Sequence, residues 1–201
     1  IQKYAHIYGL DQKTGLEISE SKSSVATKYP VMAAIGQSDN NYTTVALSRY
    51  VTAVASGKKY NYQLMDRIVD ASGKTVKKYK ADYEDISDTL TDSQWDALHS
   101  GMRQVVSTMD RFQGFDIPVA GKTGTAQQTG HANHGLFIGY APYDDPEITI
   151  AVRIANGYSS HNAATAARNV ISYYYKETSM KDIKEMKAAG VNGNTRNSVA
   201  D

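Results

Sequence analysis

Hydrophobic positions recur at helical spacing in several stretches of the chain, and this pattern predicts four helices. Each stretch begins or ends at a residue suited to a helix terminus, such as a threonine cap or a glycine stop. The predicted helices are residues 2–8, ended by Gly9; residues 43–57, capped by Thr43 or Thr44 and stopped by Gly57; a helix that follows the capping-box sequence Thr91–Gln94; and residues 161–176.

Each of the three longer helices has an apolar face. The second helix carries Leu47, Tyr50, Val51 and Val54 on one side, and the third carries Trp95, Leu98, Met102, Val105 and Val106. The last carries Ala163, Ala167, Val170, Ile171 and Tyr174, a face suited to covering a sheet.

Shorter runs between turn-forming residues predict strands. Residues 62–69 and 75–79 form a predicted hairpin through Asp70–Gly73, and residues 118–127, 135–141 and 147–155 form a predicted antiparallel meander. A helix that covers an antiparallel sheet defines an α+β arrangement, which is the fold class we expect. Residues 10–29 are predicted to be a polar linker, and residues 179–201 a charged, partly disordered tail.

Composition fits a globular segment and excludes several classes of protein. The 201 residues are 41% hydrophobic and 21% charged, with a formal net charge of +1, which gives no indication of nucleic-acid binding. The lysines between Lys74 and Lys80 are interpreted as a solvated strand face. The absence of cysteine excludes disulfides and thiolate metal sites. No apolar run is long enough to span a membrane, so an anchor would lie outside this chain.

One short run between two predicted strands carries candidate chemistry. Gly121-Lys122-Thr123-Gly124-Thr125-Ala126-Gln127 combines glycines, which let a ligand backbone lie close, with threonine hydroxyls and one compact positive charge. A second Lys-Thr-Gly sequence, at Lys13–Gly15, lies in a polar stretch without flanking strands and is interpreted as a surface turn.

The first of these runs resembles the Lys-Thr-Gly motif of penicillin-binding proteins and serine β-lactamases. From about Tyr4 to Tyr175 the chain is similar to the C-terminal part of a class B penicillin-binding protein transpeptidase domain. The landmarks that carry this resemblance are Tyr8-Gly9-Leu10, Lys13–Leu16, Ala34–Gln37, Thr44–Arg49, Gly101–Val106, Leu136–Pro142 and Asp145–Ile148.

The resemblance implies roles for the motif residues. Lys122 would face a catalytic serine and organise its proton network, and Thr123, Gly124 and Thr125 would bind the substrate, with the threonines holding its carboxylate. The N–H of Thr125 would lie in the oxyanion hole. Ideal strand alternation puts Lys122 on the face opposite to both threonines, so a twisted edge strand or main-chain contacts must reconcile these roles.

Two further motifs of the family, Ser-x-x-Lys and Ser-x-Asn, match only by accident. Ser19–Lys22 and Ser38–Asn40 fit the letters, but Ser19 has no apolar helix around it that would bring a lysine amine to its hydroxyl. The two serines are also 19 residues apart, too few for the long core helix between these motifs in the family. We therefore expect a fragment that is inactive alone.

The reaction implied for the parent protein is serine-type transpeptidation of peptidoglycan stem peptides ending in D-Ala-D-Ala, with β-lactams acylating the same serine. We expect no cofactor and no metal; His131 and His134, three positions apart on a strand, are interpreted as structural. The expected partners are stem peptides, β-lactams and the missing N-terminal half of the domain, and the expected location is extracytoplasmic. A β-lactam-sensing receptor, a serine β-lactamase and a non-catalytic interaction fragment remain alternatives.

Residues 1–178 are expected to be the C-terminal portion of one transpeptidase domain. Without the other half, one face of the sheet would lack its helices. The sequence therefore predicts aggregation, self-association or binding of a complementary fragment.

Overall fold

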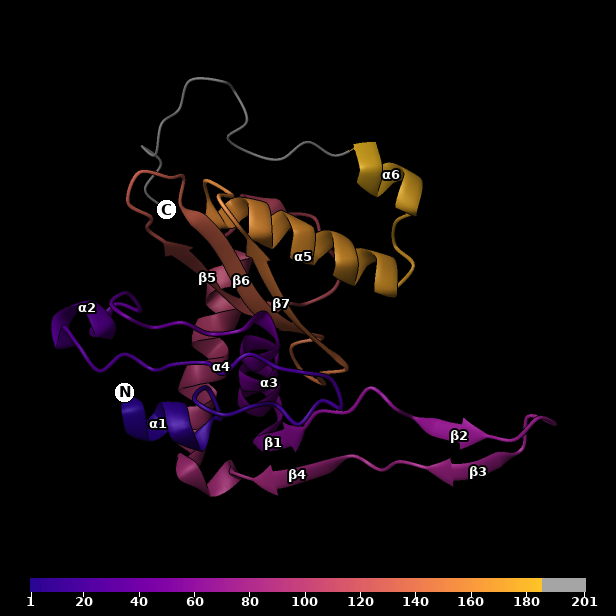
Figure 1. The fold of residues 1–201 in the computed structure, drawn as a ribbon. Helices are drawn as coiled ribbons and strands as arrows, with labels where there is room; N and C mark the ends of the chain where they lie inside the picture. The colour runs from indigo at the N-terminus through magenta and orange to yellow at the C-terminus, as the bar shows by residue number, and fades with distance from the viewer. Residues whose placement is uncertain (186–201) are drawn as a thin grey trace. The chain divides into compact units, whose positions relative to one another are not determined.

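The predicted helix after Thr91 opens the second of two units into which the chain divides, Ile1–Thr89 and Leu90–Asp201. The structure is a computed structural model that describes residues 1–185. Figure 1 shows the helices and strands of both units. Among the described residues, no helix is both long and apolar enough to cross a membrane.

The second unit is built on the predicted meander. Strands β5 (Ala120–Ala126), β6 (His134–Ala141) and β7 (Ile148–Ile154) form an antiparallel sheet in the order β5-β6-β7. Helix α5 (Ser160–Tyr174) lies across one face of this sheet in Figure 1. Helices and an antiparallel sheet therefore form the expected α+β arrangement.

The core of the second unit lies between α5 and the sheet. Phe137 of β6 is fully buried and belongs to one apolar cluster with Ala163, Ala167 and Ile171 of α5. The predicted apolar face of this helix was partly wrong, because Val170 and Tyr174 are about half exposed and Ala164 is buried in their place. Small alanines let the helix approach the sheet closely, and this close packing decides which face is buried.

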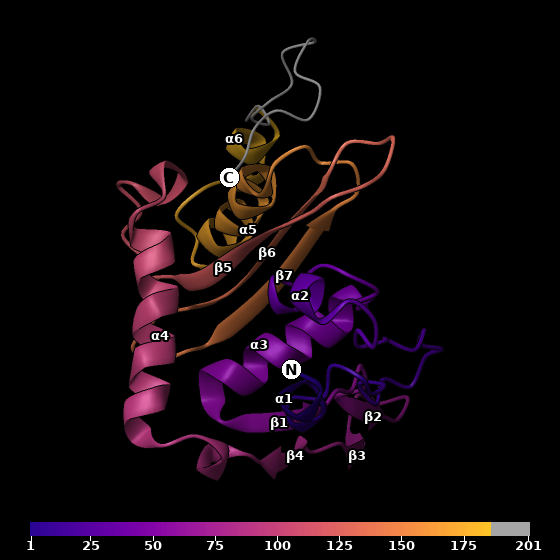
Figure 2. The ribbon, with the colours of Figure 1, turned by 90° about the vertical axis from the view of Figure 1, so that its left-hand side faces the viewer.

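Helix α4 (Asp92–Ser107) confirms the capping-box prediction. The Thr91 side chain accepts from the backbone of Gln94, and the backbone N–H of Thr91 donates to Gln94 Oε1 at 2.9 Å. Figure 2 shows the helix passing the start of β5. A 3₁₀ turn, η2 (Asp110–Phe112), follows α4 and adds Phe112 to the core.

The first unit contains three helices and two strand pairs. Helices α1 (Gln2–Ile7) and α3 (Thr44–Ser56) agree with the prediction, and Gly9 and Gly57 have the expected left-handed backbone. Helix α2 (Pro30–Ala34) was not predicted. The strands are β1 (Lys58–Asn61), β2 (Arg67–Val69), β3 (Thr75–Lys78) and β4 (Asp82–Asp85), and the 3₁₀ turn η1 (Ser87–Thr89) ends the unit.

The predicted hairpin is the outer half of a longer arm. Strands β2 and β3 pair as expected, and β1 pairs with β4 to continue the ribbon toward α3. The inner pair was missed because its segments, Lys58–Asn61 and Asp82–Asp85, are polar and show no alternation of apolar residues. Cross-strand polar contacts hold it instead, including a 2.7 Å salt bridge between Lys59 and Glu84.

The interpretation of Lys13–Gly15 as a surface turn was partly wrong, because Lys13 and Gly15 are exposed but Thr14 between them is fully buried. The carboxylate of Glu20 accepts hydrogen bonds from the Thr14 hydroxyl and from the backbone N–H groups of Thr14, Gly15 and Leu16. A polar sequence can therefore be buried when one charged side chain satisfies its donors.

Arg49 of α3 holds the other side of this loop. Its side chain is buried and donates to the carbonyl oxygens of Gly9, Gln12 and Lys13. The helical pattern placed no charged residue in the core, so the sequence did not reveal this role.

The predicted tail at residues 179–201 is described only in part. It contains the short helix α6 (Met180–Glu185), and residues 186–201 lie outside the described part of the chain. The assignment of residues 1–178 to a portion of one domain stays a prediction.

Candidate functional site

The four predicted site residues lie consecutively on the edge strand β5. This strand pairs with β6 on one side, with Lys122 opposite Ile138 and Thr123 opposite Phe137. Within the described part of the second unit, no strand pairs with the other side of β5. Alternate N–H and C=O groups of an edge strand point outward, where an extended ligand can pair with them.

The register assigns the site side chains to opposite faces of the sheet. Residues directly opposite each other in an antiparallel pair share a face, so Thr123 lies on the face of Phe137 and Lys122 on the face of Ile138. Thr125 shares the face of Thr123, because residues two apart do so. A ligand along the open edge would thus meet the lysine from one face and the threonines from the other.

Lys122 is exposed, and its ammonium group donates to the carbonyl oxygen of Thr123 at 2.7 Å. This contact holds the positive charge beside the strand that a ligand would line. An anionic ligand can displace the carbonyl oxygen from this contact, because the hydrogen bond of an ammonium group to a carboxylate is stronger than its bond to a neutral carbonyl.

The ring of Phe137 packs against the site strand β5 at Gly121. A Cβ atom at Gly121 would lie 2.4 Å from the ring of Phe137, and one at Gly139 would lie 2.8 Å from it. The ring also stacks on Phe112, with centroids 5.9 Å apart. Glycine is therefore required at both positions to let the aromatic ring lie across the two strands.

Gly124 has a different environment. A Cβ atom there would make only an ordinary 3.5 Å contact with Leu136. Packing within the protein therefore does not require glycine at this position. A smooth strand surface that lets a ligand backbone come close is a physical reason to keep it.

Both ends of the site strand are held by side chains of the second unit. At its start, Arg103 of α4 donates to the carbonyl oxygen of Val119 at 3.1 Å. Near its end, Ala126 pairs with His134, whose Nδ1 accepts the backbone N–H of Asn156 at 3.0 Å. These contacts limit movement of β5 relative to its neighbours.

His134 has a structural environment, in agreement with its interpretation. Its Nε2 lies 2.9 Å from Nη2 of Arg153. Burial, and then the positive charge of Arg153, lower the pKa of His134 and favour the neutral ring. The side chain thus joins β6, β7 and the loop that follows β7.

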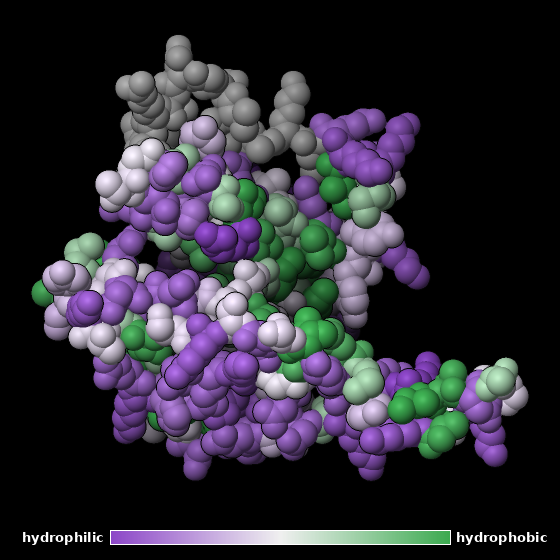
Figure 3. Space-filling view, in the orientation of Figure 1, coloured by the Kyte–Doolittle hydropathy of each residue, from purple (hydrophilic) through white to green (hydrophobic). Residues whose placement is uncertain are grey.

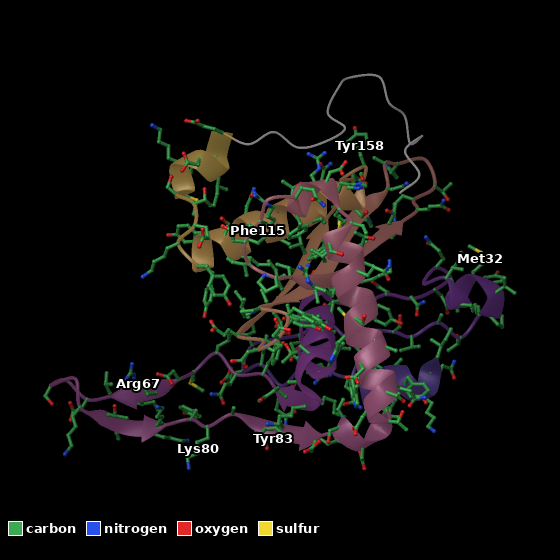
Figure 4. All side chains as sticks on the ribbon, turned by 180° about the vertical axis from the view of Figure 1, so that it is seen from behind. Met32, Arg67, Lys80, Tyr83, Phe115 and Tyr158 are labelled. Carbon is green, nitrogen blue, oxygen red and sulfur yellow. The ribbon has the colours of Figure 1, made fainter. Side chains whose placement is uncertain are left out.

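The loop between β7 and α5 lies close to this end of the sheet. Asn156 and Tyr158 adopt left-handed backbone conformations, and the Tyr158 N–H donates to the carbonyl oxygen of Asn133. Figure 4 labels Tyr158, which is about half exposed. The sequence identified this loop but gave no signal for its conformation.

The two rejected serine motifs lie outside any helix. Ser19 and Lys22 are both exposed in irregular chain, so no helix aligns the hydroxyl with the amine. The Ser38 hydroxyl donates to the carbonyl oxygen of Lys28 at 2.6 Å and to Asp39 at 2.8 Å. The hydrogen bond from Ser38, followed by those from nearby backbone N–H groups, lowers the pKa of Asp39 to about 2 against the effect of desolvation. The lowered pKa makes Asp39 a weak base for the Ser38 hydroxyl, and no helix presents a lysine amine to either serine.

A family model of the penicillin binding protein transpeptidase domain matches residues 1–172. This chain therefore belongs to the penicillin-binding protein transpeptidase family. The peptidoglycan D,D-transpeptidase MrdA of Haemophilus influenzae is 27% identical over 208 residues, which cover 85% of this chain and 32% of the relative. Penicillin-binding protein 2B of Streptococcus pneumoniae is 30% identical over 195 residues, which cover 84% and 28%. The chain spans about a third of the length of these relatives.

Solved structures confirm the fold class. Penicillin-binding protein 2B of Streptococcus pneumoniae aligns with a TM-score of 0.74 and 25% identity over 89% of this chain and 32% of that one. An imipenem acyl-enzyme complex of penicillin-binding protein A from Mycobacterium tuberculosis aligns with a TM-score of 0.75 and 22% identity over 85% and 40%. The described α+β arrangement is thus a partial transpeptidase fold.

Proposed function

We propose that this chain supplies the Lys-Thr-Gly wall of the active site of a serine D,D-transpeptidase. The observation that carries the proposal is the position of Lys122–Thr125 on the open edge strand β5, in a chain of the penicillin-binding protein transpeptidase family. An edge strand can hold an extended stem peptide by main-chain pairing.

The reaction assigned to the parent protein is acyl transfer. A serine hydroxyl attacks the carbonyl carbon between the two terminal D-alanines, its proton passes to the lysine network, and D-alanine leaves with a proton on its new amine. The amine of a neighbouring stem peptide then displaces the serine oxygen, which regains its proton. No cofactor takes part in this balance.

Each residue of the wall has a separate role in this reaction. Lys122 provides the positive charge that organises the proton network of the serine. Thr123 and Thr125 hold the substrate carboxylate, Gly124 lets the substrate backbone come close, and the N–H of Thr125 stabilises the oxyanion. Loss of one such donor in other hydrolases costs about 3 to 4 kcal/mol of transition-state stabilisation.

The nucleophilic serine is proposed to come from sequence that this chain does not contain. Neither Ser19 nor Ser38 lies in a helix that presents a lysine amine, and the Asp39 carboxylate beside Ser38 is a weak base because its pKa is lowered, so neither serine is activated for attack. We therefore propose that the isolated chain does not react with penicillin, and that its partner in the site is the other half of the same domain.

Covalent labelling with a fluorescent penicillin tests this function. The isolated chain should remain unlabelled, and the whole transpeptidase domain that contains it should be labelled on a serine outside residues 1–201. Lys122→Ala in the whole domain should slow acylation about 100-fold, the size expected for losing an electrostatic group of the site. Lys181→Ala, on exposed α6, is the matched control and should leave the rate unchanged.

Three results would contradict the proposal. A labelled Ser19 or Ser38 in the isolated chain would identify a nucleophile within it. An unchanged acylation rate in the Lys122→Ala variant would remove this residue from the proton network. Absence of labelling in the whole domain would favour the non-catalytic interaction fragment.

The persistence of the label, together with an assay of stem-peptide cross-linking, separates the transpeptidase from the alternatives of similar fold. A serine β-lactamase would release the label quickly by hydrolysis, whereas a transpeptidase keeps it. A sensing receptor would keep the label but would not cross-link stem peptides. The relative named as a peptidoglycan D,D-transpeptidase supports the first assignment. We place the parent protein outside the cytoplasm, held by an anchor beyond this chain, because its proposed substrate is peptidoglycan.

A further inference from the structure

The outer half of the β-hairpin arm, residues 63–80, exposes an unusual number of apolar side chains. Leu64, Met65, Ile68, Val69 and Val76 are each between 42% and 67% exposed. In Figure 3 the arm shows green hydrophobic surface beside purple hydrophilic surface. Soluble surfaces seldom gather this much apolar area on one small element unless it contacts something else.

The same arm is strongly basic. Residues 63–80 carry a net charge of +3, from Arg67, Lys74, Lys77, Lys78 and Lys80 against Asp66 and Asp70. Figure 4 labels Arg67 and Lys80 on the arm. Both acidic groups have internal contacts: Asp66 lies 3.2 Å from Nε of Arg67, and Asp70 Oδ1 accepts from the hydroxyl of Ser72 at 2.6 Å. The chain as a whole has a net charge of only +1, so positive charge is concentrated here.

The arm is also held in shape. Asp70 accepts from the backbone N–H groups of Ser72 and Lys74, which fixes the turn between β2 and β3. At the base of the outer half, the carboxylate of Glu17 accepts from the backbone N–H groups of Leu64 and Met65. The exposed side chains are thus presented on a preorganised element, which lowers the entropy cost of binding.

Both outer edges of this ribbon are open. Within the part of the first unit that the structure describes, β2 and β3 pair only with each other. Lysine on such an edge discourages pairing between copies of the same chain, because like charges would meet. The edge can still pair with a strand of opposite charge.

We propose that the outer arm binds an extended segment of another protein in which two acidic residues alternate with two apolar residues. The segment adds a strand to the edge of the β2–β3 ribbon. Ile68 pairs with Lys77, so these two residues lie on one face of the ribbon and Val76 and Lys78 lie on the other. Each face therefore offers an apolar side chain and a lysine, and a segment with this pattern presents an apolar side chain and a carboxylate to each face. An anionic polymer without apolar groups would use the lysines but leave the apolar side chains uncovered, so a protein segment fits the arm better. This inference does not depend on the proposed catalytic role.

The test uses the complete 201-residue chain and a fluorescein-labelled peptide in which two glutamates alternate with two valines, so that both residue types occur on each face of the strand. Fluorescence anisotropy in 150 mM salt should detect saturable binding. A double variant Ile68→Thr/Val76→Thr and a double variant Lys77→Glu/Lys78→Glu should each weaken binding at least ten-fold. Hydrogen exchange should slow on residues 64–80 when the peptide is bound.

Matched controls come from other exposed elements. Val31→Thr/Ile35→Thr changes two apolar residues at α2 that are more exposed than Ile68 and Val76, and Lys181→Glu/Lys184→Glu changes two lysines of α6. Neither control should alter the affinity, and circular dichroism should show that all four variants keep the secondary structure of the unmodified chain.

Several outcomes would overturn the proposal. The glutamate–valine peptide could fail to bind, or the control variants could weaken its binding as much as the arm variants do. A peptide of glutamate alone could bind equally tightly and be insensitive to Ile68→Thr/Val76→Thr, which would indicate attraction of an anionic polymer by charge only. Finally, hydrogen exchange could slow only at residues outside the arm, which would show that the peptide binds elsewhere.

Discussion

Two glycines of the site strand, three positions apart, are kept for different physical reasons. Gly121 has an aromatic ring against it and has no room for a side chain, whereas Gly124 has room for one. Sequence patterns treat both as members of one motif. The structure separates a glycine that the protein needs for packing from a glycine that a ligand would need.

Substitution by alanine should distinguish these two glycines. Gly121→Ala places a methyl group 2.4 Å from the Phe137 ring, so the free energy of unfolding should fall by about 1 to 3 kcal/mol. Gly124→Ala, the matched control, should be neutral or stabilising by up to about 1 kcal/mol, since alanine restricts the unfolded chain more than glycine. Urea denaturation measures both values, and equal losses would contradict the assigned difference.

Glu20 illustrates a residue whose importance lies in the backbone groups that it satisfies. Glu20→Ala would leave the hydroxyl of the buried Thr14 and three backbone N–H groups without this acceptor. The free energy of unfolding of the first unit should fall by about 2 kcal/mol or more. Glu177→Ala, which changes an exposed glutamate in the second unit, should fall within about 0.5 kcal/mol of the unmodified chain. A loss no larger than this control would show that water replaces Glu20 as acceptor.

At the scale of elements, those with a strong local signal agree with the prediction. The capping box at Thr91, the threonine cap and glycine stop of α3, and the three strands of the meander were all identified from sequence. Local hydrogen-bonding and apolar periodicity determine these elements, and both are visible in the residues themselves.

The cap of α4 should contribute measurably to stability. Thr91→Ala removes the side-chain acceptor of the capping box and should lower the free energy of unfolding by about 1 kcal/mol. Ser100→Ala, at an exposed position within the same helix, should change it by less than about 0.5 kcal/mol. Chemical denaturation followed by circular dichroism gives both values, and an equal effect of the two changes would argue against the cap.

Elements that depend on distant partners were not predictable. Strands β1 and β4 are 20 or more residues apart along much of their pairing, and the Lys59–Glu84 contact that joins them cannot be read from either segment. The buried Arg49 and the burial of Thr14 likewise follow from contacts with a loop that has no apolar pattern. The position of Lys122–Thr125 on a strand was predictable, because its signals are the alternation of residues and the turns at both ends, which are local in sequence. The open edge of this strand was not predictable, because it depends on which strands pair in the sheet.

At the scale of the whole molecule, exposed apolar surface predicts association. Within the first unit, Tyr29, Val31 and Ile35 at α2 are 69%, 82% and 71% exposed, and the outer arm adds the apolar residues described above. The chain should therefore form species larger than the 22.0 kDa monomer at high concentration. Size-exclusion chromatography with light scattering measures the mass of these species. A monomer at all concentrations would show that hydration of the exposed apolar side chains costs too little free energy to drive association.

Different interactions stabilise the interior of each unit, so the two units should differ in their stability at low pH. Glu17, Glu20, Asp39, Asp70 and Asp85 all accept hydrogen bonds within the first unit, and all have a pKa below the ordinary value, although desolvation opposes this most at Glu20. A carboxyl group whose pKa is lowered by folding stabilises the fold at pH values above its unfolded-state pKa. This contribution is lost as the pH falls through the pKa of the folded state.

The second unit instead packs around the apolar cluster of Phe137 and α5, which has no proton to gain. Acidification below about pH 4 should therefore destabilise the loop of Thr14 and the hairpin arm first. Protonation of His134, whose pKa is lowered, removes one contact at the end of β5, but the apolar cluster should keep the sheet that carries Lys122 folded. Acid thus offers a way to examine the site strand by itself without cutting the polypeptide.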